Sequence, residues 1–188
     1  LKGGEILLVH CGRLSPEKKP ERSIEALREL IKRGVNARLI VVGTGPLYKK
    51  LYNSSRDIPV TFWGYVANKN LLAEIIASAD ITIAPGPIET FCLAALESLA
   101  SGTPVVTSNS NAVGEFLIQG LNCHAGATAN DNYDSIADAI ERVIRKREIR
   151  LRARAVAEEM PWENTVKQML EVHGIPSKPT TSALLKAS

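Results

Sequence analysis

The fold of this protein is decided by residues 81–107, which read ITIAPGPIETFCLAALESLASGTPVVT. The short apolar run Ile81–Pro85 predicts a strand, Cys92–Ser101 predicts a helix that ends at Gly102, and Val105–Thr107 predicts the next strand. Both strand segments are continuously apolar rather than alternating, which is typical of a parallel sheet buried on both faces. Because parallel strands need a crossover between them, the helix is expected to connect the two strands across one face of the sheet.

The same alternation of strand and helix extends toward both ends of the chain. Further strands are predicted at Glu5–Gly12, Arg38–Gly43, Val60–Trp63 and, as a small last strand, Cys123–Ala125. Further helices are predicted from Pro20 to Gly34 and at Pro46–Asn53, Asn68–Ser78, Ala112–Gln119, Tyr133–Arg147, Ile149–Glu159 and Trp162–His173. We therefore predict an α/β fold, a Rossmann-like and mostly parallel six-stranded sheet with helices on both faces.

Length and composition favour one folded domain. The 188 residues, 45% of them apolar, are enough to bury a full core, and we predict a domain over residues 1–174 followed by a flexible tail over residues 175–188, which contains two prolines and several Ser and Thr residues. Because the first residue is Leu1 and a strand-like run begins almost at once, we expect the chain to be one part of a longer polypeptide.

Charge and cysteine usage exclude several classes of protein. Lys and Arg outnumber Asp and Glu by only 23 to 20, which argues against a nucleic-acid surface, and no stretch approaches the roughly 20 apolar residues of a membrane span. The three cysteines, Cys11, Cys92 and Cys123, are odd in number and far apart, so they indicate neither a disulfide framework nor a metal site. A reducing, cytoplasmic location fits this pattern best.

Ligands of open parallel sheets bind outside the carboxyl ends of the strands, so functional residues are expected in the loops that follow the strands. Residues 12–20, after the first strand, read GRLSPEKKP and place Arg13 and Lys18 beside a helix start. A guanidinium can hold two oxygens, an ammonium adds a point charge, and the free N–H groups of the helix start add partial positive charge, which together form an anion site. A solvated basic turn explains the same residues, and both readings stay open.

A second glycine-rich loop follows the second strand as Gly43-Thr44-Gly45-Pro46. It does not match the dinucleotide-binding fingerprint, because Tyr48 stands where the third glycine belongs and because that fingerprint normally follows the first strand. A plain tight turn and a close backbone approach to a ligand both account for Gly43 and Gly45.

Two acids eight positions apart are the strongest functional signal. Glu89 falls in a loop shaped by proline and glycine, and Glu97 falls inside an apolar helix, where a carboxylate needs a partner. Between them, the N–H groups of Thr90, Phe91, Cys92 and Leu93 lie at the helix start and form a candidate diphosphate cradle. The alternative is a helix with Glu89 as an N-terminal charge and Glu97 extended to solvent.

Other titratable residues carry less information. His10 and His124 lie in predicted strands, where packed or exposed roles are expected, and without nearby partners they indicate no metal site. Cys92 opens a helix but has no histidine close in sequence to activate it. Glu115, in a polar loop after the fifth strand, fits both ligand contact and helix capping.

Taken together, these stretches resemble the carboxyl-terminal domain of the family 4 retaining glycosyltransferases of the GT-B fold, over about residues 6–173. The family's Gly-Arg, short gap and Lys pattern is matched by Gly12, Arg13 and Lys18, and its Glu-x7-Glu motif by Glu89 and Glu97, followed by Gly-Thr-Pro-Val-Val at 102–106. The resemblance implies that Arg13 and Lys18 bind the diphosphate of the donor, that Glu89 lies near its hexose, and that Glu97 binds the ribose. The sequence departs from the family at Cys92, where glycine is usual, and at Thr44, where aspartate is common.

The resemblance also implies a function for the chain. Within the family, the chain is most similar to the α-mannosyltransferases that use GDP-mannose. The resemblance therefore implies GDP-mannose as the donor, with a UDP-sugar as the alternative, and it implies no other cofactor and no metal. It implies an amino-terminal acceptor-binding domain in the same polypeptide, and it leaves peripheral association with a membrane as an option for the full enzyme. Two other functions stay open, a sugar-nucleotide epimerase of similar fold and a non-catalytic nucleotide-binding domain.

Overall fold

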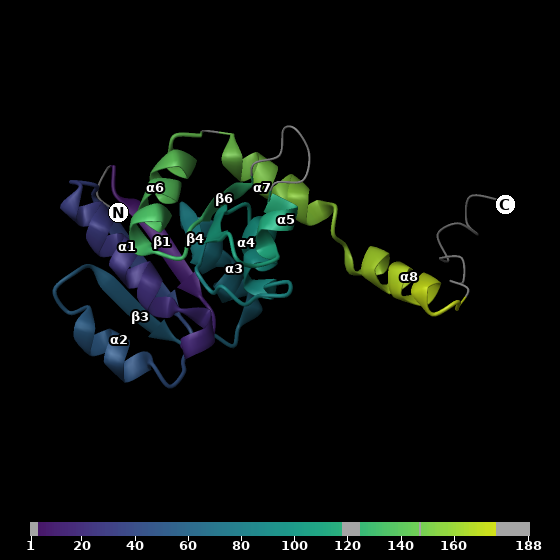
Figure 1. Cartoon of the computed structure of the whole chain (residues 1–188), viewed down its shortest axis with the longest axis horizontal. Coiled ribbons are helices and arrows are strands. Elements are labelled where there is room, and N and C mark those ends of the chain that lie inside the picture. The colour runs from purple at the N-terminus through teal and green to yellow at the C-terminus, as the bar shows by residue number, and fades with distance from the viewer. Residues whose placement is uncertain (1–3, 118–124, 147, 176–188) are drawn as a thin grey trace. The chain divides into compact units, whose positions relative to one another are not determined.

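The computed structural model describes residues 4–117, 125–146 and 148–175. Six strands form one sheet in the order β3-β2-β1-β4-β5-β6, and every neighbouring pair is parallel, so the sheet is wholly rather than mostly parallel (Figure 1). The strands are β1 (Ile6–Cys11), β2 (Ala37–Val42), β3 (Val60–Gly64), β4 (Ile81–Ala84), β5 (Val105–Ser108) and β6 (Gly126–Ala129).

Helices connect the strands and cover both faces of the sheet. A short 3-10 turn, η1 (Pro16–Lys18), precedes α1 (Pro20–Lys32). The other helices are α2 (Tyr48–Ser54), α3 (Lys69–Ser78), α4 (Leu93–Ala100), α5 (Val113–Leu117), α6 (Tyr133–Ile144), α7 (Ile149–Glu158) and α8 (Trp162–Val172).

Alternation of side chains along β1 divides the core into two layers. Leu8 packs with Leu27 of α1 and Ile140 of α6 on one face, whereas Leu7 and Val9 belong to the layer that contains Ile75 of α3 on the other face. Leu8, Leu27 and Ile140 have no exposed surface, and burial of such a side chain stabilises the fold by about 1.5–3 kcal/mol.

The strand order creates a switch point in the middle of the sheet. From β1 the chain moves outward through β2 and β3, then returns to pair β4 with the other side of β1 and continues outward through β5 and β6. The loops after β1 and β4 therefore diverge from neighbouring strand ends, which is where open α/β sheets bind their ligands.

The predicted elements are confirmed with three shifts. The last strand was predicted at Cys123–Ala125 and lies instead at Gly126–Ala129, and Cys123 itself is outside the described residues. This prediction was wrong because the small residues of GATA give a weak strand signal, although Gly126 is required there: a Cβ atom at this position would lie 1.8 Å from the carbonyl oxygen of Val105. Helix α2 begins at Tyr48 rather than Pro46, and the described part of α5 is Val113–Leu117.

The chain divides into two compact units, Leu1–Ala157 and Glu158–Ser188. The described part of the second unit is dominated by α8, whose apolar residues Trp162, Val166 and Met169 are all more than half exposed. Of the tail predicted at residues 175–188, all but Ile175 lies outside the described residues, so that boundary stays a prediction. No helix in the described ranges is both long and apolar enough to span a membrane.

Candidate functional site

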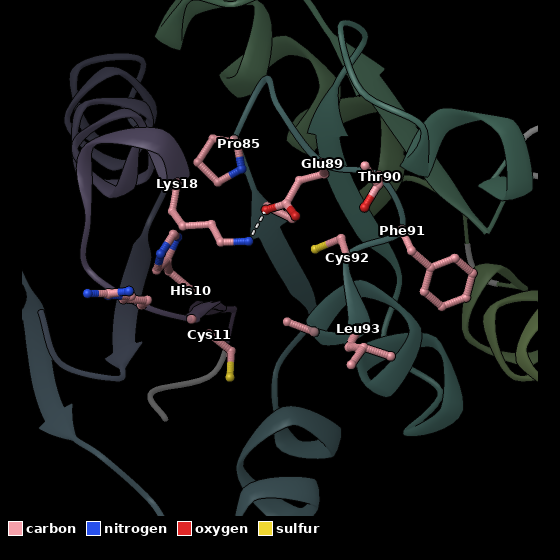
Figure 2. A pocket seen from close by; sticks show the side chains of 14 residues that line it. His10, Cys11, Lys18, Pro85, Glu89, Thr90, Phe91, Cys92 and Leu93 are labelled. Carbon is pink, nitrogen blue, oxygen red and sulfur yellow. Dashed lines mark hydrogen bonds and ion pairs between the residues drawn. The ribbon is translucent and has the colours of Figure 1, made fainter.

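The largest concentration of the predicted site residues lies at the switch point between β1 and β4. A pocket of about 560 Å³, here called the main pocket, opens at the carboxyl ends of these strands (Figure 2). Eight residues singled out from the sequence line it: Gly12, Arg13, Lys18, Glu89, Thr90, Phe91, Cys92 and Leu93. Its volume is within the range of small-molecule sites, and residues from two loops about 70 positions apart in the chain meet around it.

Lys18 and Glu89 face each other across the main pocket. The Nζ atom of Lys18 donates a hydrogen bond of 2.5 Å to Oε1 of Glu89, and the two side chains are 34% and 10% exposed (Figure 2). Local backbone geometry brings Lys18 to this position, because the 3-10 turn is followed by Lys19 in a left-handed conformation (φ 51°) and then by Pro20, the first residue of α1. Arg13 is exposed and forms no ion pair within the described part of the chain, so its guanidinium remains available for an anion.

The loop that carries Glu89 is held by side chains from other elements. Asn111 Nδ2 donates to the carbonyl oxygen of Gly86 at 2.6 Å, and Arg22 donates to that of Pro85 at 3.2 Å while it pairs with Asp131 at 3.1 Å. The backbone N–H of Ala112 donates to the carbonyl oxygen of Glu89 itself. None of these contacts was predicted from the sequence, since they join residues 23 to 109 positions apart in segments without a recognisable motif.

The start of α4 forms one wall of the main pocket. Cys92 is the residue before the first turn and adopts a left-handed conformation (φ 59°), which favours glycine. Burial raises the pKa of the Cys92 thiol, and the negative charge of Glu89 acts in the same direction. Burial, followed by the charge of Glu97, raises the pKa of Cys11 to about 11. Both thiols therefore stay protonated near neutral pH, which argues against a thiolate nucleophile in this pocket.

The two glycines after β2 line a neighbouring pocket rather than the main one. A cavity of about 530 Å³, here called the side pocket, is lined by Gly43 and Gly45 and shares Cys11, Gly12 and Arg13 with the main pocket. A Cβ atom on Gly43 would lie 1.9 Å from the carbonyl oxygen of Gly12, and one on Gly45 would lie 2.4 Å from that of Leu14. Contact between the two loops, rather than a ligand, is what requires glycine at both positions.

The other walls of the side pocket come from residues that sequence reasoning missed. Tyr65 and Val66 follow β3, and Leu72 lies on α3. Their position directly after a parallel strand would have identified Tyr65 and Val66, because the carboxyl end of β3 lies at the same edge of the sheet as those of β1, β2 and β4.

Glu97 does not line either of these pockets. It is exposed and lines a smaller groove of about 340 Å³ between α3 and α4, together with Lys69 and Ser101. Ala94, which lines the main pocket, is three residues earlier on α4, so Glu97 lies about one turn farther along the same face of the helix. The structure thus brings Arg13, Lys18 and Glu89 together and places Glu97 beside them in an adjoining groove.

The remaining candidates are distributed around this region. His10 is buried and lines the main pocket, Glu115 is exposed on α5, and His124 is outside the described residues. Among the residues that the structure describes, no group of three or more His, Cys, Asp or Glu side chains is arranged to hold a metal ion.

Comparison with known proteins gives a consistent result. Residues 1–160 match the family described as Glycosyl transferases group 1. The chain is 43% identical over 172 residues to a GDP-mannose-dependent alpha-(1-6)-phosphatidylinositol dimannoside mannosyltransferase of Mycobacterium tuberculosis, which covers 90% of this chain and 44% of the relative. It is 31% identical over 180 residues to a glycosyltransferase of Methanocaldococcus jannaschii, covering 91% of this chain and 45% of that protein.

Solved structures agree on the fold. The crystal structure of Anabaena Alr3699/HepE in complex with UDP and glucose superposes with a TM-score of 0.75 at 22% identity, over 91% of this chain and 48% of that one. The chain spans less than half the length of the curated relatives and of this structure.

Proposed function

Because this chain belongs to the group 1 glycosyl transferases, we propose that it binds the nucleoside-diphosphate sugar of a retaining hexosyltransferase, with GDP-mannose as the favoured donor. The family membership confirms the resemblance found in the sequence. The identity to the mycobacterial mannosyltransferase supports mannose and GDP, and a UDP-sugar remains the alternative donor.

The single observation that carries the proposal is the composition of the main pocket. Two cations and one carboxylate, Arg13, Lys18 and Glu89, meet at the β1/β4 switch point next to the start of α4. Two protein cations suit a diphosphate leaving group, which carries two negative charges in the donor and gains one more when its bond to the sugar breaks. A carboxylate beside them accepts hydrogen bonds from sugar hydroxyls and so orients the hexose.

Each part of the sugar nucleotide is assigned a place on this basis. The diphosphate lies against Arg13, Lys18 and the backbone of residues 90–93, and the hexose lies near Glu89. The side pocket, which joins the main pocket at Gly12 and Arg13 and is walled by Tyr65, Val66 and Leu72, suits the flat base. Binding of the ribose by Glu97 stays a prediction.

The acceptor site is proposed to lie in another part of a longer protein. The relatives are about twice as long as this chain, which supports a separate acceptor-binding half. The exposed apolar residues of α8, Trp162, Val166 and Met169, recur at the spacing of one helix face and suit a contact with such a half. A cytoplasmic location and peripheral contact with a membrane stay predictions.

Calorimetric titration of this chain with GDP, UDP and NAD tests the proposal. GDP or UDP is expected to bind, and Lys18→Met is expected to weaken that binding by roughly tenfold or more, because a charge-assisted hydrogen bond is lost. Lys50→Met, on the exposed side of α2, removes the same charge away from both pockets and serves as the matched control. Binding of NAD without binding of GDP or UDP would contradict the proposal.

A further inference from the structure

His10 has an unusual environment for a residue that lines a pocket. It is the fifth residue of β1, only 3% exposed, and it lies among the residues that wall the main pocket. Figure 2 shows its ring beside the side chain of Lys18. The Nε2 atom is buried and has no hydrogen-bond partner in the described part of the chain. A buried polar atom without a partner is costly, so its position at this pocket calls for a function.

The other ring nitrogen indicates which tautomer is present. Nδ1 lies 2.9 Å from Oγ of Ser23, a fully buried residue in the first turns of α1. The Ser23 hydroxyl makes no other side-chain hydrogen bond in the described structure, so we infer that it donates its proton to Nδ1 of His10. Nδ1 then accepts, and the ring proton resides on Nε2, which becomes a donor.

The charge of the ring supports the same assignment. Burial lowers the pKa of His10 to about 4; the backbone of Ile83 opposes this shift, the positive charge of Lys18 adds to it, and the ring is therefore neutral at physiological pH. A neutral N–H group adds a directional contact without a further positive charge beside Lys18.

We propose that the Nε2–H group of His10 donates a hydrogen bond to an oxygen atom of the bound sugar nucleotide. The inference rests on the proposed function, and it adds to Arg13, Lys18 and Glu89 a fourth residue that contacts the same ligand. Because Nε2 is buried, the proposed contact requires a neighbouring side chain to move, and Lys18 does so if a diphosphate draws its Nζ atom away from Glu89. The acceptor is a phosphate oxygen or a sugar hydroxyl, and titration with GDP and with GDP-mannose distinguishes the two.

Matched substitutions separate the two ring nitrogens. In His10→Asn the side chain ends near the position of Nδ1 and loses the Nε2 donor, whereas His10→Gln reaches the position of Nε2 and retains an N–H group there. Titration with GDP-mannose is expected to show roughly tenfold weaker binding by His10→Asn and a change within about threefold for His10→Gln. His173→Asn, at the end of α8 and not part of the pocket lining, is the control and is expected to bind as the unchanged chain does.

Titration with GDP identifies the oxygen. If a phosphate accepts the hydrogen bond, His10→Asn weakens GDP and GDP-mannose equally; if a sugar hydroxyl accepts it, only GDP-mannose is weakened. Nitrogen-15 imidazole spectra of the unchanged chain give a readout that does not depend on the variants folding. The spectra are expected to show the Nε2–H tautomer of His10 and a shift of that resonance when GDP-mannose is added.

Two results overturn the inference alone: an Nδ1–H tautomer, or binding of GDP-mannose with an unshifted His10 resonance and no loss in His10→Asn. Failure of the unchanged chain to bind GDP, UDP and their sugars would overturn the proposed function, and this inference with it.

Discussion

The Nζ atom of Lys18 lies 2.5 Å from Oε1 of Glu89, so the cation assigned to the diphosphate and the carboxylate assigned to the hexose are paired with each other in the structure. Glu89 is 10% exposed, and a carboxylate so deeply placed gains from a charged partner. A sugar nucleotide that uses both residues must therefore replace this contact on both sides, with a phosphate for Lys18 and hydroxyl groups for Glu89.

This pairing predicts opposite effects of Glu89→Gln on the binding of GDP and on sugar transfer. Removal of the negative charge releases Lys18 and reduces repulsion of the diphosphate, so GDP is expected to bind about threefold to tenfold more tightly. Sugar transfer by a full-length protein is expected to fall, because the hexose loses a strong acceptor. Glu74→Gln, an exposed residue of α3, is the charge-matched control for the calorimetry. Weaker binding of GDP to Glu89→Gln would contradict this interpretation of the ion pair.

The network behind the Glu89 loop predicts a loss of stability on substitution of Asn111. Asn111→Ala removes the bond to the Gly86 carbonyl at 2.6 Å and the acceptor for the backbone N–H of Val113 at 3.0 Å. We expect the free energy of unfolding in urea to fall by about 1–3 kcal/mol, because partly buried groups are left unpaired. Asn70→Ala, exposed on α3, is expected to change it by less than about 0.5 kcal/mol. Equal effects of the two substitutions would show that the loop is not held in this way.

The left-handed conformation of Cys92 predicts that glycine is the better residue there. Cys92→Gly removes a steric cost of about 1–2 kcal/mol and adds a smaller loss of chain entropy, so stability is expected to rise by roughly 0.5–1 kcal/mol. Cys92→Val, whose branched side chain tolerates this conformation poorly, is expected to lower it. Urea unfolding of the three proteins checks the order, and a glycine variant less stable than the cysteine protein would refute it.

The buried ring of His10 predicts a fall in stability in mild acid. Its pKa is about 4 in the folded protein against 6.5 for the free side chain, so between these values the unfolded chain binds more protons. The stability that comes from this difference is fully present above pH 6.5 and is lost as the pH falls through 4. Between pH 7 and 4.5 the free energy of unfolding of the unsubstituted protein is expected to fall by about 2–3 kcal/mol more than that of His10→Gln. The free energy of unfolding of both proteins is measured in urea across this pH range. If the two plots against pH are parallel, His10 does not titrate in this way.

Much of the fold could be predicted because the information is local. Continuous apolar runs such as Val105–Thr107 and helix stops such as Gly102 identify most elements within a few residues. The strand at Gly126–Ala129 was predicted at the wrong position because its small residues give a weak strand signal. Gly126 is required by its close contact with β5, and no pattern within the segment reveals that contact.

The sequence by itself determined the α/β class, the order of strands and helices, and the loops in which a ligand site had to be sought, because parallel strands place their carboxyl ends at one edge. Only the tertiary structure decided which side chains meet there: Lys18 with Glu89, Asn111 with the Gly86 carbonyl, His10 at the pocket wall, and Glu97 one helical turn outside it. The reason is physical: periodicity sets the conformation of each segment, whereas contacts between segments depend on how the faces of the sheet are packed, and that packing joins residues far apart in the chain.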